Sequence, residues 1–286
     1  MKKYLKFILL GVILFNLTGC LKKDTYENIT IYTTIYPIEF ITKSLYSDHA
    51  KISSIYPNGI DINTYVLTNK KLTDYSKGDM FIYNGLSNEK DITANLLSKN
   101  KKMDIIDVSQ GLEIKNDITE LWLSPSNFLM MTSNIKNGLY DFITYKSLLE
   151  EIDEKYAELK LKISEFDAEL KLTAENCNNK KIIVANNTFK FLEKYGFEII
   201  SIASDDENSN TNISQAIKNY TSKENTYLFV LSDTEETETI KNLISKGAKK
   251  VVVPSMITLT EEQSKNNVDY ITLMRELIDS IKAEVY

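Results

Sequence analysis

The stretch YKSLLEEIDEKYAELKLKISEFDAELKLTAEN, residues 145–176, decides the architecture of this chain. It contains no glycine or proline, and its apolar residues recur at helical spacing: Leu148, Leu149, Ile152, Tyr156, Leu159, Leu161, Ile163, Phe166, Leu170 and Leu172. A helix of about 30 residues is roughly 45 Å long, enough to run the length of a two-lobed molecule. A coiled-coil partner helix is the alternative, but the heptad does not persist over several repeats. We predict an internal spine helix over 145–176.

Strand and helix patterns alternate on both sides of this helix. Before it, strands are predicted at 29–34, 50–56, 80–83 and 103–108, and helices at 39–45 and 69–76. After it, strands are predicted at 181–185, 198–202, 227–231 and 250–253, and helices at 188–195, 213–221, 235–246 and 269–285. Such alternation predicts parallel sheets with right-handed crossovers. The expected fold is α/β, with an N-terminal lobe over 29–144 and a C-terminal lobe over 177–286.

The N-terminus has the pattern of a bacterial lipoprotein export signal. Three lysines precede an apolar run over residues 7–15. This run is shorter than the about 20 residues that a permanent membrane span needs. It is followed by Leu-Thr-Gly-Cys at 17–20, which resembles a lipobox. The resemblance implies a signal peptide over 1–19, acylation of Cys20 with chains such as palmitate, and a lipidated tether over 20–28. We expect an extracytoplasmic protein anchored in the cell membrane, as on a Gram-positive cell surface.

Composition excludes several classes of function. The formal charge is −6, and it becomes −9 when the signal lysines Lys2, Lys3 and Lys6 are removed. No concentrated basic run is present, so we expect no nucleic-acid partner. The 9 glycines form no phosphate-binding loop, which argues against an NTPase or a dinucleotide enzyme. Cys177 is the single thiol left after lipidation, so no internal disulfide can form, and we assign it no role.

The acidic stretch SDDENSNT, residues 204–211, alternates Asp and Asn as calcium loops do. It lacks the glycine and the closing glutamate of such loops. We expect a solvated connection here.

Four passages resemble one protein family when they are taken together and in order. They are IYTTIYPIEFITKSLYSDHAKISSIYPNGIDINTYVLT (31–68), KKLTDYSKGDMFIYNGLSNE (70–89), LWLSPSN (121–127) and TFKFLEKYG (188–196). They are similar to the zinc and manganese solute-binding lipoproteins of bacterial ABC importers, the cluster A-I group. The resemblance implies two α/β lobes joined by a rigid helix, with the ligand in a cleft between them. It also implies an ABC permease as partner and a monomeric binding protein.

The resemblance also locates the metal-ligand positions of that family, and this chain has no histidine at any of them. Asn63 stands in Asp-Ile-Asn-Thr-Tyr, Glu120 in Thr-Glu-Leu-Trp-Leu, and Asn186 three residues before the first phenylalanine of the TFKF element. The fourth position falls within 254–260, a segment without a carboxylate, where Ser255 or Thr258 is the expected occupant.

Two aromatic residues accompany these positions. The resemblance places Tyr65 and Trp122 at the cleft, and we expect Trp122 to pack in the core beneath it.

The lack of histidine at these positions limits which metal ions the chain can bind. His49 is the only histidine, which excludes a site with two histidines, and its place before a strand predicts a solvated turn residue. Amide oxygens with one carboxylate match zinc poorly and are at best tolerable for calcium or magnesium. We predict that metal binding is weak, altered or lost. The alternative is a divergent site in which other carboxylates hold a divalent cation, by resemblance zinc or manganese; no other cofactor is expected.

Two functions follow as hypotheses. The first is a solute-binding lipoprotein that delivers a metal ion or small solute to the permease of a metal-type ABC importer. The second is a surface lipoprotein that uses the same scaffold for adhesion or protein contacts. An enzyme is not expected, since His49 alone supplies no recognisable Ser-His-Asp or Cys-His set and no paired carboxylates stand at a typical spacing.

Overall fold

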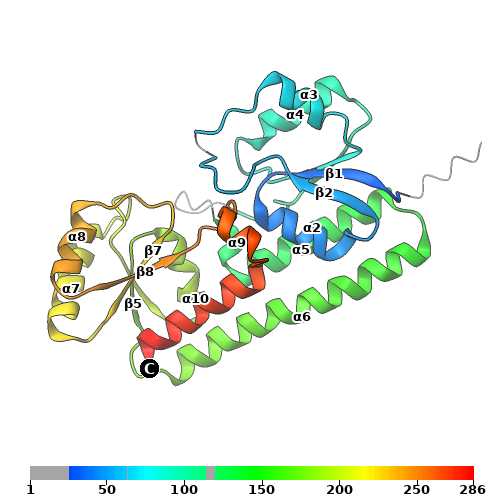
Figure 1. Cartoon of the computed structure of the whole chain (residues 1–286). Helices are drawn as coiled ribbons and strands as arrows, with labels where there is room; N and C mark the ends of the chain where they lie inside the picture. Colours follow the sequence, from blue (N-terminus) through cyan, green and yellow to red (C-terminus); the bar gives the residue numbers. More distant parts are fainter. Residues whose placement is uncertain (1–25, 63, 114–119) are drawn as a thin grey trace, which may run out of the picture.

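The protein consists of two α/β lobes connected by one long helix (Figure 1). The computed structural model describes residues 26–62, 64–113 and 120–286. The predicted export signal, the predicted lipidation site Cys20 and the predicted ligand position Asn63 lie outside the described residues. Among the helices that are described, none combines the length and the apolar character needed to span a bilayer.

The N-terminal lobe contains a parallel sheet with the strand order β2-β1-β3-β4. Its strands are β1 (Ile29–Thr33), β2 (Ala50–Ser54), β3 (Met80–Tyr83) and β4 (Asp104–Asp107). Its helices are α2 (Tyr36–Tyr46), α3 (Asn69–Tyr75), α4 (Glu89–Lys99), η1 (Leu121–Leu123) and α5 (Pro125–Phe142).

The C-terminal lobe repeats this strand arrangement as β6-β5-β7-β8, again all parallel. Its strands are β5 (Lys181–Val184), β6 (Glu198–Ser201), β7 (Tyr227–Leu231) and β8 (Lys249–Val253). Its helices are η2 (Asn187–Tyr195), α7 (Ser209–Ser222), α8 (Glu238–Ser245), α9 (Glu261–Lys265) and α10 (Tyr270–Val285). Alternate residues of β5 serve two cores: Ile182 and Val184 join the main core, whereas Ile183 packs with the core beneath α7 and α8.

Helix α6 (Lys146–Asn176) is the predicted spine, and it runs beside both lobes (Figure 1). It packs against α2 and α5 of the first lobe and against α10 and η2 of the second. His49, the only histidine, lies in a turn before β2 as predicted. Its ring is half-buried, however, and its Nε2 lies 2.9 Å from Glu151 near the N-terminus of the spine. Near its C-terminus, Glu169 pairs with Arg275 and Lys282 of α10.

The α/β fold class with a long connecting helix is confirmed, whereas several local predictions differ from the structure. The sequence patterns did not predict α4, α5 or α9. The segment predicted as a helix over 188–195 is a 3-10 helix. The acidic stretch 204–211 is not simply a solvated connection, since α7 begins at Ser209 and Asp206 is buried with its carboxylate 2.7 Å from the Lys190 ammonium.

Candidate functional site

The segment that follows β8 joins the two lobes through its backbone. The carbonyl of Ile257 accepts the Tyr36 N–H at 2.9 Å, and the carbonyl of Leu259 accepts the Gly59 N–H at 2.7 Å. Between them, the Thr258 hydroxyl donates to the Ile60 carbonyl at 3.2 Å. Thr258, one of the two expected occupants of the fourth ligand position, therefore bonds the lobes together.

Ser255, the other expected occupant, is buried and bonded through its backbone. Its carbonyl accepts the indole N–H of Trp122 at 2.7 Å, and its own N–H donates to the Ser232 hydroxyl at 3.1 Å. The Trp122 carbonyl in turn accepts the Tyr270 hydroxyl at 2.7 Å. Trp122 is only 3% exposed, so it packs in the core where the lobes meet.

Tyr65 lies in the N-terminal lobe, half-buried. Its ring packs edge-on against Tyr56 with centroids 5.9 Å apart, and its hydroxyl accepts a hydrogen bond from the Lys71 ammonium.

A cavity of about 730 Å³ opens at the carboxyl ends of β5, β6 and β7. In open parallel sheets, this edge is where ligands bind, at the point where successive connections leave in opposite directions. For the strand order β6-β5-β7-β8 that point lies between β5 and β7. Glu120 and Asn186 both line the cavity, so the structure brings these two predicted positions together. Tyr65, Trp122, Ser255 and Thr258 do not line it.

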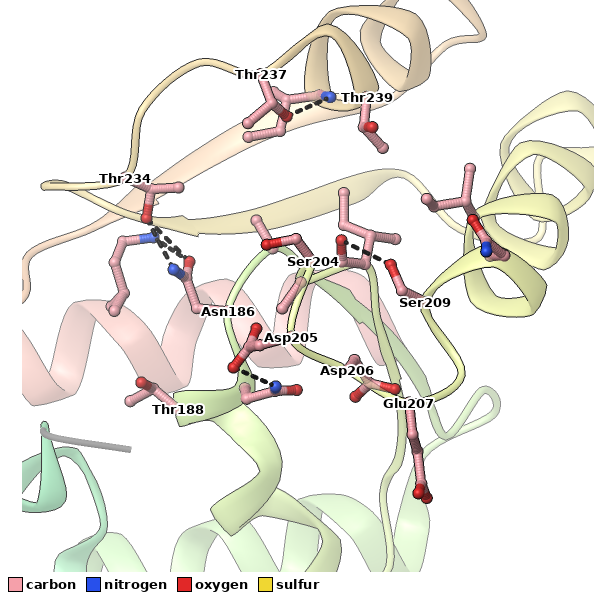
Figure 2. A pocket seen from close by; sticks show the side chains of 18 of the residues that line it. Asn186, Thr188, Ser204, Asp205, Asp206, Glu207, Ser209, Thr234, Thr237 and Thr239 are labelled. Atoms are coloured by element: carbon pink, nitrogen blue, oxygen red, sulfur yellow. Dashed lines mark hydrogen bonds between the residues drawn. The ribbon is translucent and has the colours of Figure 1, made fainter. Parts of the chain in front are cut away.

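The side-chain oxygen of Asn186 accepts two hydrogen bonds that hold the end of β7 (Figure 2). Its Oδ1 accepts the Leu231 N–H at 3.0 Å and the Thr234 hydroxyl at 3.1 Å. Its Nδ2 lies 2.9 Å from the same hydroxyl oxygen. An amide oxygen has two lone pairs, and both are used here. Asn186 therefore links the end of β5 to the end of β7 through side-chain hydrogen bonds.

Glu120 shares the cavity lining with Asp233, a carboxylate that the sequence prediction missed. One oxygen of Glu120 accepts the Thr188 hydroxyl at 2.8 Å. Asp233 is exposed at the cavity rim, but partial desolvation by the surrounding protein raises its pKa. Repulsion from Glu120 and Asp61 adds to this, while a hydrogen bond from Ser255 opposes it. Glu120 and Asp233 therefore supply two carboxylates to one cavity wall. Nevertheless, no group of three His, Cys, Asp or Glu side chains within residues 26–62, 64–113 and 120–286 is placed to hold a metal ion.

The loop after β6 supplies the opposite side of the cavity (Figure 2). Asp205 accepts a hydrogen bond from Asn187 Nδ2 at 3.1 Å. Asp206 pairs with Lys190, and its other oxygen accepts the Asn208 N–H at 2.9 Å, and together these contacts lower its pKa despite burial. The acidic stretch is thus fixed in place by hydrogen bonds and one ion pair.

The sequence prediction left out Asp205 and Asp233, although one feature of the sequence could have identified both. Each follows a strand of the second lobe within a few residues. Carboxyl ends of neighbouring parallel strands meet at one edge of the sheet, so polar residues in these places mark a candidate site even without a motif.

Comparison with known proteins places the chain in a family. Residues 31–284 match the family model described as zinc-uptake complex component A, periplasmic. The chain is 23% identical over 282 residues to the high-affinity zinc uptake system protein ZnuA of Bacillus subtilis, with 90% of this chain and 87% of that protein aligned. It is also 23% identical over 288 residues to the zinc-binding lipoprotein AdcA of Streptococcus pneumoniae, of which it spans 56%.

Solved structures agree on the fold. The crystal structure of the metal-dependent lipoprotein YcdH from Bacillus subtilis superposes with a TM-score of 0.75 at 20% identity, covering 90% of this chain and 99% of that one. The Zn(II)-bound ZnuA-like domain of Streptococcus pneumoniae AdcA gives 0.72 at 20% identity, again with 90% and 99% covered. The chain therefore belongs to the zinc and manganese solute-binding protein family of ABC importers, whose members are binding proteins and not enzymes.

Proposed function

We propose that this chain is an extracytoplasmic lipoprotein that captures a solute for the permease of a metal-type ABC importer, and that it holds zinc weakly or not at all. Membership of the family supports the transport role. The lipobox pattern ending at Cys20 supports a membrane anchor on the outer face.

The proposal of weak or absent zinc binding rests on the hydrogen bonds of the Asn186 side chain. Both lone pairs of its Oδ1 are committed to Leu231 and Thr234, so a metal at this position would have to break bonds that hold β7. An amide oxygen is also a poor zinc ligand compared with imidazole or thiolate. Glu120 remains as a carboxylate at a ligand position of the family, which is compatible at most with a hard cation.

Thermal unfolding of the full chain in detergent tests this proposal. We expect micromolar zinc, manganese or calcium to leave the melting temperature within about 1 °C of the value in chelator. By contrast, a tight ligand at a hundredfold excess over its Kd adds about 2.7 kcal/mol to the free energy of unfolding. For a domain of 150–250 residues, 1 kcal/mol corresponds to roughly 2–4 °C.

The matched control is His49→Ala, which removes the only imidazole of the chain. A zinc effect that disappears in this variant comes from His49 and leaves the proposal intact. A chelator-reversible rise of several degrees that persists in His49→Ala would contradict the loss of tight zinc binding.

A further inference from the structure

The 730 Å³ cavity beside Asn186 is much larger than a bare metal ion requires. Sites for small organic molecules occupy about 300–1,000 Å³ and occur at switch points of α/β sheets. The loops after β5, β6 and β7 supply most of the lining, and Glu120, before η1, completes it, so the cavity lies at the carboxyl end of one sheet. Both its size and its position fit a small organic solute.

The chemistry of the walls specifies the charge of such a solute. Five carboxylates line the cavity: Glu120, Asp205, Asp206, Glu207 and Asp233. No lysine, arginine or histidine is among the described lining residues, and Lys190 neutralises Asp206 from outside the lining. Neutral donors position two of the others, Thr188 on Glu120 and Asn187 on Asp205. A cationic solute is therefore favoured over a neutral or anionic one.

The same lining distinguishes between kinds of cation. It offers oxygen acceptors in hydroxyl, amide and carboxylate groups, and no aromatic ring is among its described members. Quaternary ammonium ions have no N–H donors and are typically held by aromatic cages. Primary and secondary ammonium groups donate N–H bonds to carboxylates, and such charge-assisted bonds are the strong ones.

The carboxylates fall into two groups on different elements. Glu120 and Asp233 line the cavity from the segments before η1 and after β7. Asp205 and Glu207 line it from the loop after β6 (Figure 2). We propose that this cavity binds a small organic cation carrying at least two primary or secondary ammonium groups, one for each carboxylate group. The inference rests on the proposed role as a solute-binding protein, and it names the class of solute.

Calorimetric titration of the full chain in detergent at 150 mM salt tests the proposal with two probes of equal charge and chain length. One is 1,6-diaminohexane, and the other is hexamethonium, its fully methylated analogue without N–H groups. We expect saturable binding of one diamine per chain and at least about tenfold weaker binding of hexamethonium, since N–H bonds to charged groups are lost. Equal affinity for the two probes, or no saturable heat with the diamine, would overturn the proposal.

Variants locate the site. Asp233→Asn and Asp205→Asn each remove one charge from a different carboxylate group, and we expect each to weaken diamine binding about tenfold. Asp279→Asn is the control, because Asp279 is an exposed carboxylate of α10 that is not among the residues lining the cavity. A melting curve verifies that each variant folds. Equal weakening by all three variants indicates a general charge effect and contradicts the proposal.

Zinc titrated into the same samples separates this inference from the proposed function. Tight zinc binding contradicts the proposed loss of metal affinity whatever the diamine does. If neither zinc nor the diamine binds, the inference about the solute is wrong and the proposed loss of zinc affinity stands.

Discussion

At the scale of single residues, Glu89 is a buried carboxyl group whose pKa is raised. It is 4% exposed at the start of α4, and one oxygen accepts the Asn84 N–H at 2.8 Å. Burial raises its pKa to about 7, although the hydrogen bond from Asn84 acts in the opposite direction. The folded protein therefore binds a proton at Glu89 that the unfolded chain releases at lower pH.

This sets the sign of a pH dependence. The folded pKa lies above the unfolded one, so the stability linked to Glu89 is fully present below about pH 4.5 and is lost as the pH rises through about 7. The loss is on the order of 3 kcal/mol. Glu89→Gln stays neutral, and we expect denaturant titrations at pH 5 and pH 8 to give it a smaller pH-dependent loss than the wild type.

The comparison variant for this measurement is Glu276→Gln, which alters an exposed carboxyl group of α10. It should retain the pH dependence of the wild type. If Glu89→Gln retains it as well, Glu89 does not titrate in this range.

At the scale of elements, the second lobe depends on a carboxylate that joins α10 to β7. Glu284 is 9% exposed and accepts hydrogen bonds from Asn225 Nδ2 at 2.6 Å and from the Tyr227 N–H at 2.9 Å. Glu284→Ala removes the acceptor of the Tyr227 N–H and of one N–H of Asn225, whose side-chain nitrogen keeps its bond to the Lys181 carbonyl, and each unpaired N–H costs about 1–3 kcal/mol. We expect the free energy of unfolding to fall by roughly 2–4 kcal/mol, measured from the denaturant midpoint.

An exposed position on the same helix provides the reference. Glu276→Ala should change stability by less than about 0.5 kcal/mol, as surface substitutions usually do. Equal effects of the two substitutions would show that the bonds to β7 contribute nothing.

Elements also show where sequence patterns were insufficient. Strands β3 and β7 match their predicted ranges, because short apolar runs bounded by turns mark buried parallel strands. Helix α5 was missed, since its sequence is rich in residues of low helix propensity and carries Gly138 in its interior. A Cβ at Gly138 would lie 2.6 Å from Ile106, so the glycine allows the helix to approach β4. Packing, and not propensity, decides that helix.

At the scale of the whole molecule, the contact between the lobes depends on backbone groups around Trp122. Trp122→Phe removes the indole N–H that bonds to the Ser255 carbonyl, which loosens the segment that receives the Tyr36 and Gly59 amides. We expect faster hydrogen exchange at those two amides, with exchange in β5 and β7 unchanged. The loss of stability should be about 1–3 kcal/mol.

Tyr65→Phe is the matched control, because it also removes one polar atom from an aromatic side chain, outside these contacts. It should leave exchange at Tyr36 and Gly59 unaltered. Unaltered exchange in Trp122→Phe would mean that the indole does not support the contact between the lobes.

The sequence by itself determined the two α/β halves, the long helix between them and the scarcity of metal ligands. The first two follow from local periodicity, and the third follows from composition, since one histidine excludes a site with several imidazoles whatever the fold. Only the tertiary structure decided what the side chains at the predicted ligand positions contact. Asn186 reaches Leu231 and Thr234, which lie 45 and 48 residues further along the chain, and the cavity forms where three separate loops meet. Such contacts depend on how strands are ordered in the sheet, and local sequence patterns carry little information about that order.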